Sequence, residues 1–219
     1  MTVPSLPWMP DEYQERYLRA LKSSLVTFVD APSGTGKTTL AVYQGLNLLM
    51  QPTSNINKLI YIRFPDDRYH KQGFLPGNLE EKSEGLFGPF YDAALECDFS
   101  EADIAYLQSQ DQLKLLTDTT LRGVNFTNSF IIVDEAQNAR TIDDLHLVLS
   151  RLHDNCRAVV IGHSKQQDNR KTTFYAGKTP FQLFMAHSKT APWASCVKLV
   201  HNYRGKISQW ADSIWEAIE

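Results

Sequence analysis

The chain lacks the features that mark a secreted or membrane-spanning protein. Its 219 residues include three cysteines, Cys97, Cys156 and Cys196, which are far apart and form no C-x-x-C pair. This usage argues against a disulfide framework or a cysteine-based zinc site. No apolar run is long enough to cross a bilayer, and residues 1–10 lack the basic start and apolar core of a signal peptide. We therefore expect a cytoplasmic protein with no membrane partner.

The chain also lacks a strong charge of either sign. It has 22 basic and 25 acidic residues, for a net charge of −3. This balance gives no support for a strongly basic nucleic-acid binder, although a local basic patch is compatible with a neutral total. No internal repeat or low-complexity linker is present. With 42% hydrophobic residues, residues 1–219 can form a single domain with a sizeable core.

The most informative stretch is Ala31-Pro-Ser-Gly-Thr-Gly-Lys-Thr38. It matches the phosphate-loop pattern A/G-x-x-x-x-G-K-S/T, with the tolerated Ala at the first position. The apolar run Leu25–Val29 before it predicts a buried strand, and Thr38–Met50 after it predicts a helix. This order aims successive backbone N–H groups and a helix N-terminus at one anion. The residues expected to bind the nucleotide phosphates are Pro32, Ser33, Gly34, Thr35, Gly36, Lys37, Thr38 and Thr39.

A second motif supplies what the first lacks for hydrolysis of a nucleoside triphosphate. Phe130-Ile-Ile-Val-Asp-Glu-Ala-Gln137 is an apolar strand that ends in two carboxylates. We expect Asp134 and the Thr38 hydroxyl to hold Mg²⁺, and Lys37 to contact the β- and γ-phosphates. Glu135 would take the proton from the attacking water, or orient that water.

Apolar runs and helical patterns alternate along the chain. The predicted strands are Leu25–Val29, Lys58–Ile62, Leu113–Leu116, Phe130–Val133, Ala158–Ile161 and Cys196–Val200. The predicted helices are Glu12–Leu21, Thr38–Met50, Leu86–Glu96, Glu101–Ser109, Ile142–His153, Thr179–Ala186 and Lys206–Ile218. This alternation predicts an α/β fold, a mainly parallel sheet covered by helices on both faces. Ligands then lie at the carboxyl ends of the strands, where both motifs fall.

Residues 63–88 interrupt this pattern. They are rich in glycine, proline and charge, and we expect a long functional loop or insertion there.

Several motifs together resemble the PhoH-like (phosphate-starvation-inducible) ATPases. Gly73-Phe-Leu-Pro-Gly-Asn-Leu-Glu-Glu-Lys82 resembles the family's GFLPGDLEEK segment. Leu121-Arg-Gly123 and Ile131-Ile-Val-Asp-Glu-Ala-Gln-Asn138 resemble its M-R-G and I-I-L-D-E-A-Q-N motifs. The resemblance runs from about Glu12 to the C-terminus. It implies a single RecA-like core, binding and hydrolysis of ATP, and a role on RNA. It also suggests a homo-oligomer such as a hexamer. Related helicases hold ATP between two such folds, and this chain is long enough for one. Compact members are often encoded by bacteriophages.

The resemblance also assigns roles to single residues. Gln14 resembles a glutamine that reads adenine, since a carboxamide offers both a donor and an acceptor. Gln166, in Gly162-His-Ser-Lys-Gln166, resembles a sensor of the γ-phosphate, although His163 replaces the family's usual aspartate. Arg204 resembles an arginine that stabilises charge on the transferring phosphoryl group, in cis or from a neighbouring copy. Arg122 is a second candidate for that role.

Two clusters in which basic and aromatic residues alternate predict contacts with RNA or single-stranded DNA. The larger cluster is Tyr61, Arg63, Phe64, Arg68, Tyr69, His70, Lys71 and Phe74. The smaller cluster is Arg170, Lys171, Phe174, Tyr175 and Lys178. The same aromatics could instead pack inward from solvated loops. His146 and His153 lie seven residues apart on one predicted helix, a spacing that does not favour a metal site.

Two other functions stay open at this point. A nucleotide-dependent switch would hydrolyse slowly and recruit a partner such as a nuclease. A small-molecule kinase shares the phosphate loop, although Glu135, Gln137 and Gln166 suit activation of water better than binding of a phosphate acceptor.

Overall fold

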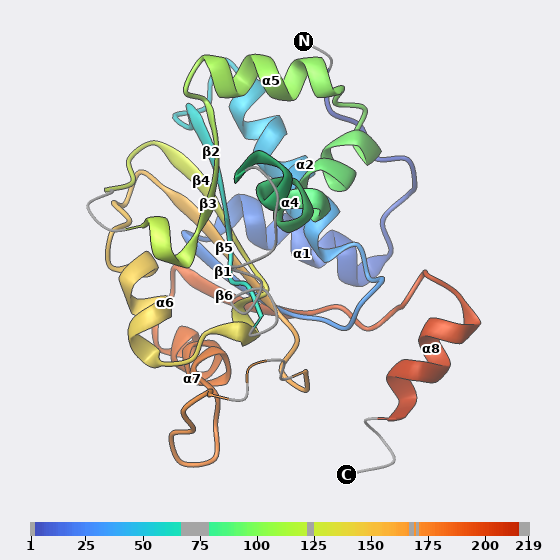
Figure 1. The fold of residues 1–219 in the computed structure, drawn as a ribbon, viewed down its shortest axis with the longest axis vertical. Helices are drawn as coiled ribbons and strands as arrows, with labels where there is room; N and C mark the ends of the chain where they lie inside the picture. The colour runs from blue at the N-terminus through green and yellow to red at the C-terminus, as the bar shows by residue number, and fades with distance from the viewer. Residues whose placement is uncertain (1–2, 67–78, 122–124, 167–168, 170, 215–219) are drawn as a thin grey trace.

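A computed structural model gives the three-dimensional structure of the chain (Figure 1). It describes residues 3–66, 79–121, 125–166, 169 and 171–214, and for residues 79–84 it describes the backbone alone.

The centre of the structure is a six-stranded sheet with every strand parallel to its neighbours. The strands follow the order β3-β2-β4-β5-β1-β6 across the sheet. Their bounds are β1 Val26–Asp30, β2 Lys58–Arg63, β3 Leu113–Thr117, β4 Ser129–Asp134, β5 Arg157–Gly162 and β6 Ala194–Lys198. Parallel pairing brings all carboxyl ends to one edge of the sheet, so the segments that follow β1, β4, β5 and β6 meet there.

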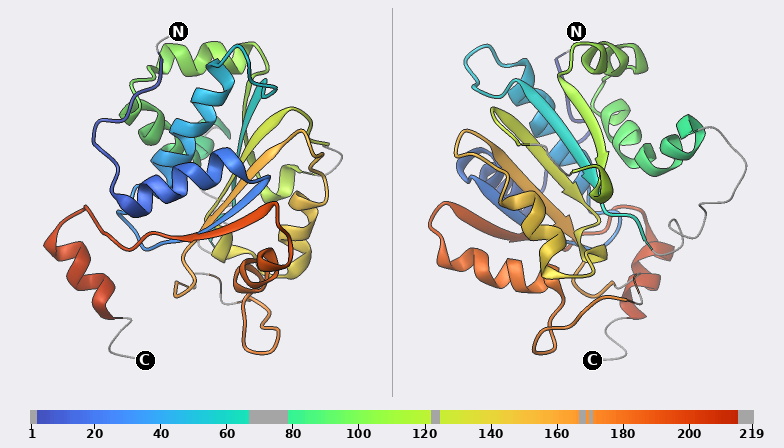
Figure 2. Two further views of the ribbon diagram at one scale, coloured as in Figure 1. Left: turned by 180° about the vertical axis from the view of Figure 1, so that it is seen from behind. Right: turned by 60° about the vertical axis from the view of Figure 1, so that its left-hand side comes forward.

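Helices cover both faces of the sheet (Figures 1 and 2). One face carries α1 Glu12–Ser23, α2 Lys37–Met50, α4 Leu79–Glu96 and α5 Glu101–Ser109. The other face carries α6 Ile142–Leu149 and α7 Pro180–His187. The helix α8 Lys206–Asp212 lies apart from both layers near the C-terminus, and short 3₁₀ turns span Asp118–Thr120 (η1), Ala136–Asn138 (η2) and Ser188–Thr190 (η3).

The alternation of side chains along the strands builds two cores. In β4 every residue is buried. Phe130 and Ile132 join the core under α1, α2 and α4, whereas Ile131 and Val133 join the core under α6 and α7. A parallel strand buried on both faces is apolar over most of its length, which explains the continuous hydrophobic run Phe130–Val133 within β4.

The predicted α/β class and parallel sheet are confirmed, and each predicted strand has a counterpart. The last strand is shifted, because it covers Ala194–Lys198 instead of Cys196–Val200. Helix α5 begins with a capping box formed by Ser100 and Asp103. None of the helices in the described part of the chain is long and apolar enough to span a membrane.

Three predicted helix boundaries are wrong. The helix predicted over Lys206–Ile218 is α8, which ends at Asp212. Helix α4 begins at Leu79 rather than Leu86, so residues 79–88 are helical and not part of an irregular loop. The helix tolerates Pro89 because Phe90 next to it is fully buried in the core, and tertiary packing overrides local propensity. Residues 67–78 of the expected loop lie outside the described residues.

The third error concerns α6, which ends at Leu149. The chain beyond it pairs with Phe126, since the Phe126 N–H donates to the Arg151 carbonyl at 3.1 Å and the His153 N–H donates to the Phe126 carbonyl at 3.3 Å. This pairing takes His153 out of the helix that carries His146, so the two histidines do not share one helix.

The close contact of α2 with the sheet predicts the effect of a small substitution. A Cβ at Gly45 would lie 2.7 Å from Leu59 Cδ1 and 2.9 Å from Phe130 Cδ1. We expect Gly45→Ala to lower the free energy of unfolding by about 1–3 kcal/mol, because overpacking outweighs the better helix propensity of alanine. Chemical denaturation would measure the change.

Gly85 of α4 provides the matched control, since a Cβ there meets nothing within 4 Å. Gly85→Ala should raise stability by about 0.5–1 kcal/mol. Equal effects at the two positions would contradict the packing argument.

Candidate active site

The loop between β1 and α2 is shaped by two glycines with positive φ. Gly34 has φ +73° and Gly36 has φ +76°, a region that residues with a side chain rarely adopt. Gly36 is the N-cap residue of α2, so the loop leads directly into a helix N-terminus. Backbone N–H groups and the positive end of the helix dipole then face one point, which suits a phosphate.

A segment from the far end of the chain covers this loop. The Tyr203 N–H donates to the Gly34 carbonyl at 2.8 Å, and Arg204 Nη1 donates to Ser33 Oγ at 2.5 Å. A Cβ at Gly34 would lie 2.6 Å from Asn202 Oδ1, so only glycine permits this approach. The structure therefore brings Arg204 to the phosphate loop of its own chain.

The carboxylate of Asp134 joins three elements. It is buried at the end of β4, with 2% of the residue exposed. Its Oδ2 accepts from Tyr61 OH at 2.6 Å and from Thr38 Oγ1 at 3.3 Å, and its Oδ1 accepts from the Glu135 N–H at 3.0 Å. Burial, with the charge of Asp134 next in importance, raises the pKa of Tyr61 well above its usual value. The phenol therefore stays a donor to the carboxylate.

Thr38 and Asp134 have a spacing that fits Mg²⁺. Adjacent oxygens of an octahedral site with Mg–O bonds of about 2.1 Å lie about 3 Å apart, close to the 3.3 Å between Thr38 Oγ1 and Asp134 Oδ2. The described residues contain no group of three or more His, Cys, Asp or Glu side chains that could hold a metal. A site with one carboxylate and one hydroxyl is typical of Mg²⁺, which completes its shell with phosphate oxygens and water.

Glu135 lies next to this pair in a restrained conformation. Its φ of +57° is in the left-handed region. One carboxylate oxygen accepts from Gln137 Nε2 at 2.5 Å, and the other lies 3.9 Å from Arg63 Nη2. Burial and then the charge of Asp134 raise the pKa of Glu135, against the opposing effects of Arg63 and Lys37. The result is a carboxylate that is more basic than a glutamate in water.

Gln137 connects Glu135 to the end of β5. Its Oε1 accepts from the His163 N–H at 3.2 Å. Burial lowers the pKa of His163, so its imidazole is neutral at pH 7. The Gln166 N–H donates to the His163 carbonyl at 3.1 Å. Gln166 thus follows the turn after β5, although it lines neither of the two cavities beside the loop.

The first cavity, of about 570 Å³, opens beside the phosphate loop. Its lining includes Trp8, Gln14, Lys37, Thr38 and Arg204. Gln14 Oε1 already accepts from Trp8 Nε1 at 3.2 Å and from the Asp11 N–H at 3.1 Å, and its Nε2 donates to the Thr35 carbonyl at 3.0 Å. Both lone pairs of the carboxamide oxygen are therefore in use. Gln14 supports the loop and retains one N–H, so reading adenine as donor and acceptor together would require these bonds to exchange.

Hydroxyls and the amine of the loop also have partners within the protein. Thr39 Oγ1 donates to Glu96 Oε2 at 2.8 Å, and Thr35 Oγ1 donates to the Pro32 carbonyl at 3.2 Å. Lys37 Nζ lies 3.3 Å from the same carbonyl. Lys37, Thr38 and Thr39 line the cavity beside the loop, while the hydroxyls of Thr35 and Thr39 are hydrogen-bonded within the protein.

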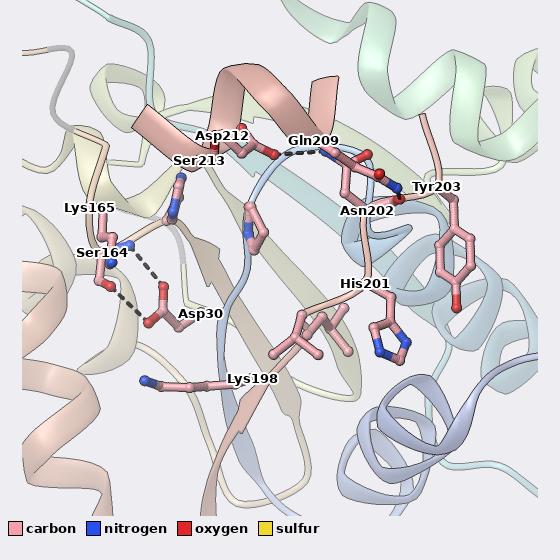
Figure 3. A pocket seen from close by; sticks show the side chains of 14 residues that line it. Asp30, Ser164, Lys165, Lys198, His201, Asn202, Tyr203, Gln209, Asp212 and Ser213 are labelled. Carbon is pink, nitrogen blue, oxygen red and sulfur yellow. Dashed lines mark hydrogen bonds between the residues drawn. The ribbon is translucent and has the colours of Figure 1, made fainter. Parts of the chain in front are cut away.

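The second cavity, of about 730 Å³, is lined by the covering segment, the end of β1 and the turn after β5 (Figure 3). Asp30 accepts from both the N–H and the hydroxyl of Ser164 at 2.8 Å, which fixes the turn after β5 to the end of β1. Asn202 Nδ2 donates to Asp212 Oδ2 at 2.7 Å, and Gln209 Nε2 donates to the Asn202 carbonyl at 2.9 Å. These bonds attach α8 to the segment that carries Arg204.

The larger predicted nucleic-acid cluster is wrong for the members that the structure describes. Tyr61 and Phe64 are buried, and Arg63 faces Glu135, so these aromatics cannot stack on bases. The cause is the position of Tyr61 and Arg63 in β2, where alternate side chains enter the core or the site. Arg122, Arg170 and residues 68–71, 73–74 and 75–78 lie outside the described residues.

Tyr61 and Arg63 are the site residues whose roles the sequence did not reveal. The register of the sheet places Arg63 opposite Asp134 and Tyr61 opposite Ile132. The available signal was the position of both residues at the carboxyl end of a predicted strand, where ligands bind in parallel sheets.

Comparison with known proteins now identifies the family. The sequence profile described as "PhoH-like protein" matches residues 10–214. The chain belongs to the PhoH-like protein family. A PhoH-like protein of Synechocystis is 36% identical over 156 residues, which cover 71% of this chain and 46% of the relative. Protein PhoH of Escherichia coli is 28% identical over 72% of this chain and 44% of its own length. The chain thus spans about half the length of the curated relatives it matches.

Solved structures with some likeness to this PhoH-like chain include the Pif1 helicase from Candida albicans. The TM-score is 0.46 at 15% sequence identity, over 94% of this chain and 43% of that one. Family and sheet topology together give this chain the α/β fold of the P-loop NTPases.

The contact between Tyr61 and Asp134 predicts a loss of stability on deletion of one oxygen. Tyr61→Phe removes a donor from a buried carboxylate, so we expect the free energy of unfolding to fall by about 2 kcal/mol. Tyr17→Phe is the matched control, because its hydroxyl donates to the uncharged Lys37 carbonyl at 3.2 Å and its side chain is equally buried. The control should lose about 1 kcal/mol. Equal losses in urea denaturation would show that the charge of Asp134 is not what Tyr61 stabilises.

Proposed function

We propose that this chain is a Mg²⁺-dependent ATPase whose hydrolysis is coupled to RNA or single-stranded DNA. The observation that carries the proposal is the convergence of four side chains from three parts of the chain. Thr38 and Arg204 lie at the phosphate loop, and Asp134 accepts from Thr38 with Glu135 beside it. Phosphoryl transfer requires little from a protein beyond such positioning and neutralisation of charge.

Each residue has a defined task in this reaction. The amides of the loop and Lys37 bind the β- and γ-phosphates, for which Lys37 Nζ leaves the Pro32 carbonyl. Thr38 and Asp134 hold Mg²⁺, which neutralises charge on the phosphate oxygens when bound. Arg204 stabilises the charge on the transferring group from within the same chain, as its contact with Ser33 favours.

Glu135 activates the attacking water. Its raised pKa favours acceptance of the proton, and the bond from Gln137 at 2.5 Å orients the carboxylate. Gln166 senses the γ-phosphate through the turn after β5, where His163 is bonded to Gln137. Gln14 supports the phosphate loop through its hydrogen bond to the Thr35 carbonyl, beside the expected position of the adenine base.

The smaller cluster of basic and aromatic residues supports a surface for single strands. Lys171 and Lys178 are exposed, and Phe174 is 53% exposed in the loop between them. The Thr173 N–H of this loop donates to the Arg140 carbonyl at 2.7 Å, a few residues beyond Glu135. Cationic side chains around an exposed ring suit phosphates and a stacked base, and the short link to the carboxylates would couple binding to hydrolysis.

A second candidate is a nucleotide-dependent switch that binds another protein or a further copy of this chain. Helix α8 favours it, because Trp210 is 77% exposed and Ile207 lies on the same side three residues earlier. Large exposed apolar residues of this kind often mark an interaction site. A homo-oligomer such as a hexamer would place this helix against a neighbouring copy.

The first test is ATP hydrolysis by the purified chain with and without single-stranded RNA, in Mg²⁺ and in EDTA. We expect hydrolysis to rise with RNA and to disappear in EDTA. Glu135→Gln should lose at least about 100-fold in rate while it still binds nucleotide, because only the transition state requires the base.

If the rate of hydrolysis does not change with RNA, the nucleotide-dependent switch becomes the favoured function. Partner capture would then test α8 as the interaction surface. A fully active Glu135→Gln variant would exclude the proposed base.

The surface around Phe174 has its own test. The triple variant Lys171→Glu/Phe174→Ala/Lys178→Glu should lose the stimulation by RNA and keep the basal ATPase, since none of the three residues lines the nucleotide cavity. The readout is the ATPase rate against RNA concentration at fixed salt.

Lys22→Glu/Lys189→Glu is the control, because it reverses two exposed lysines on α1 and in η3, away from this loop. If the control loses as much stimulation as the triple variant, overall charge and not this surface is responsible.

A further inference from the structure

Arg63, the last residue of β2, contacts two elements at once. Its Nη1 donates to the Leu86 carbonyl of α4 at 2.9 Å. Its Nη2 lies 3.9 Å from Glu135 Oε1, which is too long for a hydrogen bond and therefore a charge interaction. The side chain is only 20% exposed, so solvent screens this interaction less than it screens a surface ion pair.

We propose that Arg63 is a positioning residue for the hydrolysis reaction, which holds the Glu135 carboxylate toward the attacking water and ties it to α4. This inference rests on the proposed ATPase function, and it adds a residue and a route that the phosphate-loop and carboxylate motifs do not contain.

Glu135 needs such a restraint because of where it lies. Its backbone is in the left-handed region, and its neighbour in sequence is the carboxylate of Asp134. Two adjacent negative charges repel each other, and a free side chain would turn toward solvent. Gln137 fixes one carboxylate oxygen by a hydrogen bond, and Arg63 attracts the other. Gln137 and Arg63 belong to different elements, and together they restrict the Glu135 carboxylate to one orientation.

The bond from Arg63 to Leu86 extends this restraint to the nucleotide cavity. Helix α4 lines that cavity with Pro89, Ala93 and Glu96, and Glu96 accepts from Thr39 of the phosphate loop segment. A shift of α4 on nucleotide binding would therefore move the Leu86 carbonyl and, through Arg63, the general base.

The guanidinium of Arg63 contacts Glu135 and the Leu86 carbonyl, whereas that of Arg204 contacts Ser33 of the phosphate loop. These contacts assign Arg63 an action through Glu135 and Arg204 an action at the phosphates. The two contacts of Arg63 use different nitrogens of the guanidinium fork, which lysine cannot reproduce with a single ammonium group. Lysine at this position keeps the charge and loses one of the two contacts.

The test compares Arg63→Ala and Arg63→Lys with the wild type in steady-state ATP hydrolysis and in binding of a fluorescent ATP analogue. We expect Arg63→Ala to lower kcat by about 10- to 100-fold, since a small misplacement of a catalytic group has effects of this size. The KM and the affinity for the analogue should stay within about two-fold, because ground-state binding does not use Arg63. Arg63→Lys should recover part of kcat.

Arg19→Ala is the matched control, since Arg19 lies 3.9 Å from Glu15 in an exposed pair on α1, and it should leave kcat unchanged. A double-mutant cycle with Glu135→Asp adds a test of the route. Arg63→Ala should cost less in the Glu135→Asp background than in the wild type, because a shortened base no longer reaches its partner.

Any one of five results would overturn the inference. A fall in nucleotide affinity as large as the fall in kcat would make Arg63 a nucleotide ligand. Additive effects in the cycle, or Arg63→Lys no better than Arg63→Ala, would show a general structural role. If the wild type hydrolyses ATP and Arg63→Ala is fully active, the role of Arg63 is excluded and the proposed ATPase function stands. If the wild type does not hydrolyse ATP, the proposed function and the role of Arg63 are both overturned.

Discussion

The buried carboxylate of Asp134 is the interaction on which the site depends. A charge removed from water must be paired or hydrogen-bonded, and each donor that satisfies Asp134 comes from a different place. Tyr61 comes from β2, Thr38 from the start of α2, and the third donor is the backbone of Glu135. The three hydrogen bonds to this one carboxylate therefore fix the distance from the phosphate loop to the end of β4 and the direction in which the chain leaves β4.

The strand order explains how these elements reach one another. β5 lies between β1 and β4, so the phosphate loop and the two carboxylates are separated by one strand at the carboxyl edge. The turn after β5 fills the space between them. Ser164 in that turn bonds to Asp30 at the end of β1, and His163 bonds to Gln137 beyond β4. The turn therefore contacts the segments beyond both β1 and β4, and it carries His163 in place of the family's usual aspartate.

Sequence alone could predict some parts of the fold and of the candidate site and not others. The phosphate loop and the strand ending in Asp134 and Glu135 were both recognisable, because their chemistry depends on residues adjacent in the chain. The fold class followed from alternating strands and helices, while the helix at Leu79 and the end of α6 did not. After α6, pairing with Phe126 outweighs local propensity.

The sequence by itself indicated a phosphate loop and a strand that ends in two carboxylates, and it predicted a magnesium-binding pair and a general base there, since each is a short motif on a strand end or helix start. Only the tertiary structure decided which residues distant in the sequence contact these motifs. Tyr61 and Arg63 belong to a strand whose register with β4 no local pattern encodes. Gln14 is committed to Trp8 and the loop backbone, and Arg204 reaches its own chain's loop because the segment after β6 packs against Gly34. Local motifs fix chemistry through covalent neighbours, whereas these contacts depend on strand order and close packing between segments that are far apart in the sequence.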